Sequence, residues 1–185
     1  MYKEISENDM SKLPAIFLSY NPNSEFEETL AIRLHTIGAV HGFQMLLPDR
    51  YSNIIGVNPE TKSRILLSDY FILFSTSTLS TTVKAEIEIA YRHLNNKKKV
   101  LVIYDKHKGK NLVNAENCTE IYIDSKNESI QAILEKIITE IKQSESKYRN
   151  IIVSKDNTPD VLAGILLAGL GLLLLGTLLG GKNKR

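Results

Sequence analysis

The feature that most constrains the fold of this chain is a series of short apolar runs, separated by stretches with helical periodicity. Runs that are rich in β-branched and aromatic residues, and apolar throughout, are typical of strands that are buried on both faces of a sheet. The sequence predicts strands at residues 15–19, 43–47, 70–75, 100–104 and 120–124.

Helical periodicity fills the intervals between these strands. Ser24 and Glu27 form a capping box, after which apolar residues recur every three or four positions. Gly38 and Gly42 are predicted to end this helix. Further helices are predicted shortly before the third strand, at residues 79–94 and around the apolar stripe of residues 130–141.

The alternation of strands and helices predicts an α/β fold, with a flavodoxin-like five-stranded parallel sheet and helices on both faces. Ligands of such sheets bind beyond the carboxyl ends of the strands. The side chains that the sequence places at those ends are Ser19, Tyr20, Asp49, Arg50, Ser75, Thr76 and Asp105. These residues are the first candidates for a functional site.

The C-terminal part of the chain has a different character. Residues 161–181 carry no charge, and as a helix of about 21 residues they would extend roughly 31 Å, the thickness of the hydrocarbon core of a bilayer. A helix that is apolar on every side needs a membrane or a second core around it. We therefore expect a polar segment at 1–14, a domain at 15–145, a linker at 146–159, a transmembrane helix at 160–181 and a basic tail at 182–185.

Small residues in the tail form two pairs spaced four apart, which allow helices to pack closely. The positions of interest in the expected membrane segment are Val161, Gly164, Ala168, Gly176 and Gly180. Association of the chain with copies of itself through this face is one explanation; the other is that glycine is simply common in membrane helices. The polar N-terminus does not resemble a secretory signal, so we expect a single-pass membrane protein with a cytoplasmic N-terminal domain. The basic C-terminus would also favour the cytoplasm, so the sequence does not decide on which side of the membrane the C-terminus lies.

Composition excludes several classes of function. A formal net charge of +2 is too small to indicate a nucleic-acid partner. The single cysteine and the four histidines have no metal-ligand spacing, so no metal site is expected. Glycines in the domain are too scattered for a phosphate-binding or dinucleotide-binding fingerprint, which makes a kinase, NTPase or dehydrogenase improbable.

Two glutamates of the helix at 79–94 occupy different faces. Glu88 lies roughly 140° from the centre of the apolar stripe, where Lys84 and Arg92 are its neighbours, as on an ordinary solvated helix surface. Glu86 lies only about 60° from that centre, where a carboxylate loses hydration. Glu86 is therefore either a functional carboxylate or a boundary residue that extends to water.

The segments AIFLSY, GFQMLLPDR, SDYFILFSTSTLSTTVKAEIEIA and VLVIYD resemble the successive motifs of a Toll/interleukin-1 receptor (TIR) domain, and of bacterial members most closely. The most specific match is residues 75–90, a strand that ends in serine and a helix with a Glu-Ile-x-x-Ala pattern. Glu86 and Ala90 occupy those positions. Thr82 and Val83 stand where the family often has an aromatic and a small residue.

The resemblance implies that Glu86 is the catalytic carboxylate of an enzyme that cleaves the N-glycosidic bond of NAD. NAD would be a substrate, and no cofactor is implied. The residues assigned by this likeness to substrate binding or to the self-association loop are Ser19, Tyr20, Asp49, Arg50, Tyr51 and Ser75. The implied role is an assembly-activated bacterial defence effector, of the kind that acts against phage.

Three readings remain open at this stage. Cleavage of NAD could end in hydrolysis or in cyclisation. A non-enzymatic alternative is a TIR-like sensor or scaffold that acts through membrane disruption by its glycine-rich helix. A third is an enzyme that resembles nucleoside deoxyribosyltransferases, which share the sheet and use a glutamate at a glycosidic bond.

Overall fold

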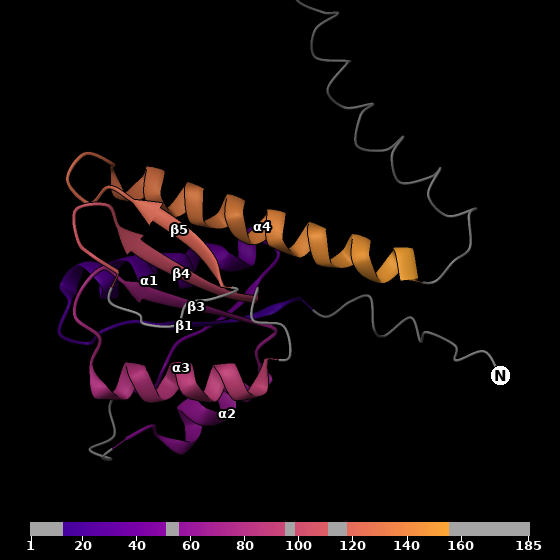
Figure 1. Ribbon diagram of the computed structural model, residues 1–185, viewed down its shortest axis with the longest axis horizontal. Coiled ribbons are helices and arrows are strands. Elements are labelled where there is room, and N and C mark those ends of the chain that lie inside the picture. The colour runs from indigo at the N-terminus through magenta and orange to yellow at the C-terminus, as the bar shows by residue number, and fades with distance from the viewer. Residues whose placement is uncertain (1–12, 51–55, 95–98, 111–117, 156–185) are drawn as a thin grey trace, which may run out of the picture. The chain divides into compact units, whose positions relative to one another are not determined.

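The structure is a computed structural model that describes residues 13–50, 56–94, 99–110 and 118–155 (Figure 1). Side chains are described up to residue 146. The chain divides into two compact units, residues 1–144 and 145–185. The sheet, its core and the site described below all belong to the first unit.

A single five-stranded sheet forms the centre of this unit. Its strands are β1 (Ala15–Ser19), β2 (Gln44–Leu46), β3 (Tyr70–Ser75), β4 (Val100–Asp105) and β5 (Thr119–Ile123). The strand order is β2-β1-β3-β4-β5 and every neighbouring pair is parallel. This is the order of flavodoxin-like sheets, so the predicted fold class of the domain is confirmed.

Helices cover both faces of the sheet (Figure 1). They are α1 (Glu25–Gly38), α2 (Pro59–Leu67), α3 (Thr81–His93) and α4 (Ile130–Lys155), with the 3-10 turn η2 (Ala39–His41) after α1. In the view of Figure 1, α2 and α3 lie below the strands and α4 lies above them, while α1 is seen behind the strands at their own level. The carboxyl ends of β1 and β3 thus meet the N-terminal part of α3 on the lower face.

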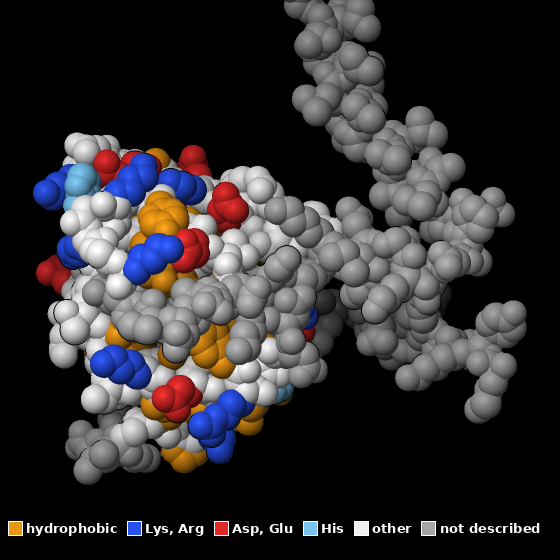
Figure 2. Space-filling model, in the orientation of Figure 1, with side chains coloured by type: hydrophobic (Ala, Val, Ile, Leu, Met, Phe, Trp, Pro, Cys, Tyr) orange, Lys and Arg blue, Asp and Glu red, His pale blue; other side chains and the backbone are white. Residues whose placement is uncertain are grey.

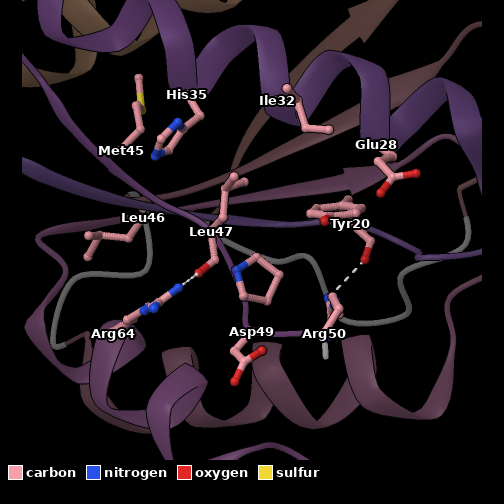
Figure 3. Close-up of a pocket in the computed structure, with 11 residues that line it drawn as sticks. Tyr20, Glu28, Ile32, His35, Met45, Leu46, Leu47, Asp49, Arg50 and Arg64 are labelled. Atoms are coloured by element: carbon pink, nitrogen blue, oxygen red, sulfur yellow. Dashed lines mark hydrogen bonds between the residues drawn. The ribbon is translucent and has the colours of Figure 1, made fainter. Parts of the chain in front are cut away.

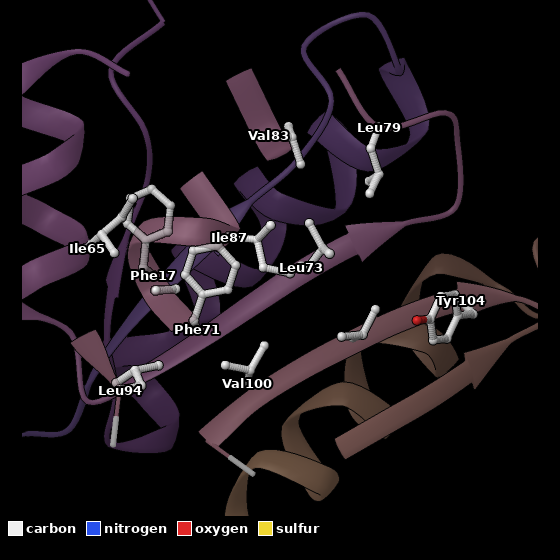
Figure 4. Close-up of a cluster of buried hydrophobic side chains, with 12 residues drawn as sticks. Phe17, Ile65, Phe71, Leu73, Leu79, Val83, Ile87, Leu94, Val100 and Tyr104 are labelled. Atoms are coloured by element: carbon white, nitrogen blue, oxygen red, sulfur yellow. The ribbon is translucent and has the colours of Figure 1, made fainter. Parts of the chain in front are cut away.

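The core between the sheet and α3 explains why α3 lies where it does (Figure 4). The rings of Phe17 and Phe71 stack with centroids 5.5 Å apart. Every member of the predicted apolar stripe of α3 is buried, namely Leu79, Val83, Ile87, Ala90 and Leu94. Burial of this stripe, at roughly 1.5–3 kcal/mol for each large side chain, fixes the rotation of α3 and with it the direction of Glu86.

Several boundaries differ from the predictions. Strand β4 ends one residue later than predicted, β5 lies one residue earlier, and α3 is shorter than the predicted residues 79–94. Strand β2 is shorter than residues 43–47, because it lies at the sheet edge and pairs with β1 alone. Helix α1 ends at Gly38 as predicted; the 3-10 turn η2 follows, and Gly42, with φ of 81°, makes the left-handed turn. Helix α4 continues past the apolar stripe to Lys155, because polar residues such as glutamate and lysine also favour helix.

Several predictions concern residues outside the described part of the chain. Among the described helices, none combines the length and apolar character that crossing a bilayer requires. The expected membrane segment at 160–181 lies outside the described residues, as does Tyr51. On the face shown in Figure 2, basic and acidic side chains are interspersed over the described elements.

Candidate active site

The carboxylate of Glu86 is held at the carboxyl edge of the sheet by residues from two other segments. Its side chain is 0% exposed. The Ser19 hydroxyl at the end of β1 donates to Oε2 at 2.5 Å. The Arg50 guanidinium donates to Oε1 at 2.5 Å and to Oε2 at 3.1 Å, in a bidentate ion pair. Ser19 and Arg50, which the sequence placed at this edge, are therefore both in direct contact with Glu86.

The two glutamates of α3 have the different environments that the helix geometry predicted. Ser80 caps the helix, and the buried stripe turns Glu86 toward the sheet. Glu88 has a side chain that is 68% exposed and lies 3.8 Å from Arg92. Glu86 is more deeply buried than its angle to the stripe indicated, because Ser19 and Arg50 replace the water that a carboxylate at the helix margin would bind.

The position of Arg50 depends on the start of helix α2. The Asp49 backbone N–H donates to the Thr61 hydroxyl at 2.8 Å, and the Asn58 amide donates to the Asp49 carboxylate at 2.7 Å. Arg64, one turn further along the helix, donates to the Leu47 carbonyl at 2.7 Å (Figure 3). These bonds attach the segment after β2 to α2 and so direct Arg50 toward Glu86.

Arg50 also binds the end of strand β1. Its guanidinium donates to the Tyr20 carbonyl at 3.0 Å and lies 5.4 Å from the centre of the Tyr20 ring (Figure 3). Its Nε is buried and has no hydrogen-bond partner within the described residues. Arg50 therefore bridges Tyr20 and Glu86, and its buried Nε–H has no acceptor among the described residues.

Two opposing influences act on the pKa of the Glu86 carboxyl. Burial raises it above the ordinary value of 4.5 because the charged form loses its hydration. The positive charge and hydrogen bonds of Arg50, and then the hydrogen bond from Ser19, act to lower it. Burial is the larger influence, so the pKa of Glu86 is raised.

Arg50 lines two pockets. The smaller, of about 180 Å³, is lined by Pro22, Asp49, Arg50, Gly56, Asn58, Thr61, Thr82 and Glu86. The larger, of about 610 Å³, lies over the edge of the sheet between α1 and α2, and Tyr20, His35, Asp49, Arg50 and Arg64 are among the residues that line it (Figure 3). Asp49 and Arg50 belong to both. Glu86 lines the smaller pocket and not the larger one.

Other predicted residues lie apart from these pockets. Ser75 lines neither pocket, and its hydroxyl is buried without a hydrogen-bond partner in the described part of the chain. Asp105 follows β4 and accepts hydrogen bonds from the Ser125 hydroxyl and the His107 N–H. Burial raises the pKa of Asp105, but these bonds outweigh it and hold that pKa below its ordinary value.

The role of Glu27 was not predicted from the sequence. Its backbone N–H donates to Ser24, as the capping box requires, but its carboxylate does not complete that box. The carboxylate is 0% exposed and binds the loops that follow β1 and β3. The pattern Ser-x-x-Glu has a sufficient local explanation, so no signal in the sequence pointed to these distant partners.

Comparison with known proteins adds information on the fold. No protein-family model and no curated protein matches the sequence. Among solved structures, the chain is similar to the metal-soaked flavodiiron core of Synechocystis sp., with a TM-score of 0.53 and 16% identity, over 75% of this chain and 38% of that one. The chain thus spans well under half the length of that protein.

Two further structures match with lower scores. A CMP N-glycosidase of Clostridium botulinum has a TM-score of 0.46 and 18% identity, over 66% of this chain and 97% of that one. A flavodoxin-like domain from Synechococcus sp. has a TM-score of 0.49 and 15% identity, over 71% and 99%. These likenesses concern the fold, so function has to be argued from the site itself.

The chemistry available at the site is that of a carboxylate beside a cation and hydroxyls. Within the described residues, no group of three or more His, Cys, Asp or Glu side chains is arranged to hold a metal ion. The small pocket offers hydrogen-bonding groups from Asp49, Asn58 and Thr61 next to Glu86. Such a set can bind the hydroxyls of a sugar and stabilise a positive charge on it.

Proposed function

We propose that this protein cleaves the N-glycosidic bond between ribose and nicotinamide in NAD, with Glu86 as the catalytic carboxylate. The observation that carries the proposal is the burial of this carboxylate beside a small polar pocket at the carboxyl edge of the sheet. Burying a carboxylate costs free energy even when it is paired, and carboxyls whose pKa is shifted by burial and by a charged partner are concentrated at functional sites. The resemblance of residues 75–90 to the TIR motif points to the same glutamate.

The proposed reaction needs only one carboxylate. The bond between C1′ of the ribose and the nicotinamide nitrogen breaks, and its electron pair stays on nitrogen, so that the cationic ring leaves as neutral nicotinamide without a proton. The ribose acquires oxocarbenium character, which Glu86 stabilises by its negative charge. Attack of water on C1′ gives ADP-ribose and releases a proton, while attack by a nitrogen of the adenine gives a cyclic product.

The hydrogen bonds of Glu86 leave room for a substrate. A carboxylate has about four lone-pair positions, of which Arg50 and Ser19 use three in this structure. The remaining position is on Oε1. A ribose hydroxyl in the small pocket would be a fitting donor to it.

The membrane segment and self-association complete the proposal. Residues 160–181 anchor the chain, with the N-terminal domain on the cytoplasmic side, and confinement to a surface raises the effective concentration of the domains. Assembly then activates the enzyme, through contacts of the domain and of the tail, in a defence response of the cell. The sequence character of the tail supports the anchor, and the family resemblance supports the role in defence.

A second candidate function has its own observation in favour. Arg50 binds both oxygens of Glu86, an arrangement that also occurs in purely structural ion pairs. On this reading the domain is a non-enzymatic sensor or scaffold, and the glycine-rich tail acts by disrupting the membrane. The two candidates differ in whether NAD is consumed.

The test uses the full chain reconstituted at high density in liposomes, with NAD, nucleosides and 2′-deoxynucleosides offered separately. We expect nicotinamide to appear from NAD, and analysis of the second product to show ADP-ribose or its cyclic form. Release of a base from nucleosides but not from NAD would favour the deoxyribosyltransferase-like reading. If every substrate stays intact while expression of the chain still harms the cell, the enzyme proposal is wrong and the scaffold is favoured.

A further inference from the structure

A second buried carboxylate, Glu27, connects the loops after β1 and β3. Its Oε1 accepts hydrogen bonds at 2.9 Å from the Thr76 N–H, the Thr76 hydroxyl and the Ser77 hydroxyl. Its Oε2 accepts from the Asn21 N–H at 2.8 Å. The Asn21 amide adds a bond of 2.8 Å to the Thr78 carbonyl. The side chain of Glu27 is fully buried and lines neither of the two pockets.

One peptide group joins Glu27 to the site of Glu86. The Asn21 N–H, which binds Glu27, and the Tyr20 carbonyl, which accepts from Arg50 at 3.0 Å, belong to the same peptide unit. A negative charge on the N–H side of a peptide group makes its carbonyl a stronger acceptor, because successive hydrogen bonds polarise one another. Arg50 in turn donates two hydrogen bonds to Glu86.

We infer that Glu27 is a positioning residue of the candidate active site, which acts through the Tyr20–Asn21 peptide to hold Arg50 on Glu86. The same attachment fixes the backbone next to Ser19, whose hydroxyl is the other hydrogen-bond donor to Glu86. The catalytic part of this inference rests on the proposed function. The structural part, the connection from Glu27 to Glu86, does not.

A direct measurement of the Glu86 carboxyl tests the structural part without any assay of activity. The full chain in detergent micelles, labelled with ¹³C at glutamate carboxyls, is titrated by NMR, and the Glu86 signal is assigned by its loss in Glu86→Gln. In Glu27→Gln, Arg50 is held less firmly on Glu86, so we expect the pKa of Glu86 to rise above its wild-type value. Glu25→Gln, in the same first turn of α1, removes the same charge at an exposed position and should leave that pKa unchanged.

A merely structural role for Glu27 would give a different result. Glu27→Gln would then lower the midpoint of thermal unfolding, while the pKa of Glu86 in the folded protein stayed at its wild-type value; that outcome overturns the inference. Should Glu27→Gln fail to fold, Glu27→Asp replaces it, because the shorter carboxylate keeps the charge but cannot reach both loops. Glu27→Asp should also raise the pKa of Glu86, and an unchanged pKa of Glu86 in this variant would contradict the inference.

The kinetic readout separates this inference from the proposed function. With NAD and the full chain in liposomes, Glu27→Gln should lower kcat about tenfold or more with little change in KM, since Glu27 does not line the pocket. Glu25→Gln should match the wild type. If the wild type itself leaves NAD intact, the proposed function fails, and the titration alone decides whether Glu27 positions Glu86.

Discussion

At the scale of single residues, the account depends on how a carboxylate is kept inside the protein. Glu86 exchanges water for one hydroxyl and one guanidinium, and Glu27 does so for two backbone N–H groups and two hydroxyls. Both lie where the ends of β1 and β3 approach each other. The difference is that Glu86 lines a pocket, whereas Glu27 lines neither of the two pockets.

The raised pKa of Glu86 predicts how stability depends on pH. Between 4.5 and the folded-state pKa, the folded protein binds more protons at Glu86 than the unfolded chain does, so the contribution of Glu86 to the free energy of unfolding decreases as pH rises through this window. Gln at position 86 does not titrate. The unfolding free energy of the wild type minus that of Glu86→Gln should therefore fall with pH above 4.5 and then level off.

Urea unfolding at a series of pH values measures this difference. Arg50 is the charged group that binds Glu86, and Asp49 is a second acidic residue that lines the same pocket. The comparison of Glu86 with Gln at position 86 is therefore repeated in a protein that carries Asp49→Asn. A difference that grows as pH rises would mean that Arg50 lowers the pKa of Glu86 below 4.5, contrary to the account. The rate of NAD cleavage should fall at acid pH as Glu86 takes up a proton, and the midpoint of this fall is expected above pH 4.5.

At the scale of elements, strands were the most predictable feature. The bounds of β1 and β3 agree with the predicted residues 15–19 and 70–75, because a strand buried on both faces is apolar at every position. The partly exposed edge strand β2 lacks this signal at its ends, and α4 extends beyond its apolar stripe. Apolarity predicts burial better than it predicts where an element ends.

The site was predictable to the extent that it depends on strand ends. The rule that ligand-binding residues follow parallel strands placed Ser19 and Arg50 at one edge of the sheet, and the angle on the helix separated Glu86 from Glu88. Only the resemblance to TIR domains assigned Glu86 to the same site as Ser19 and Arg50. Asn58 and Thr61, which hold the segment with Arg50, were missed because they follow a long polar loop with no periodic pattern. Contacts made by loops over many residues leave no local pattern in a sequence.

The close contact between α1 and β2 gives a prediction at this scale. A Cβ added at Gly38 would lie 2.3 Å from Cγ of Met45, a buried residue of the edge strand. Gly38→Ala should therefore lower the free energy of unfolding by about 1–3 kcal/mol, because the strand or the helix has to shift. Urea denaturation measures the change.

A matched glycine controls for the loss of backbone freedom. A Cβ at Gly109 meets nothing within 4 Å, and its φ is not in the left-handed region. Gly109→Ala should change the unfolding free energy by no more than about 0.5 kcal/mol. Equal effects at both positions would show that packing against Met45 is not what requires glycine at position 38.

At the scale of the whole molecule, we propose that the flavodoxin-like domain is attached to a membrane by a C-terminal segment. The described unit carries the candidate site, and residues 160–181, which lie outside the described part, carry the proposed anchor. We predict that the full chain stays with the membrane after extraction with alkaline carbonate. The variant with Leu172→Arg and Leu175→Arg should be extracted, since each arginine costs roughly 2.5–3.5 kcal/mol at the centre of a membrane helix.

The corresponding control keeps the length of the tail and changes only its apolar character. Leu172→Ile with Leu175→Ile should remain in the membrane fraction like the wild type. Extraction of the unchanged chain by carbonate would contradict the anchor, and with it the idea that a surface concentrates the domains. The catalytic claim at Glu86 would be unaffected, because it depends on the first unit alone.

The most direct test of the central claim is the rate of nicotinamide release from NAD by the full chain in liposomes, compared among the wild type, Glu86→Gln and Glu88→Gln. The two glutamates lie on the same helix, one buried in the site and one 68% exposed. The account predicts at least a hundredfold loss of rate for Glu86→Gln, on the order of 3 kcal/mol in the activation free energy, and an unchanged rate for Glu88→Gln. Release that proceeds equally well in all three proteins would contradict it.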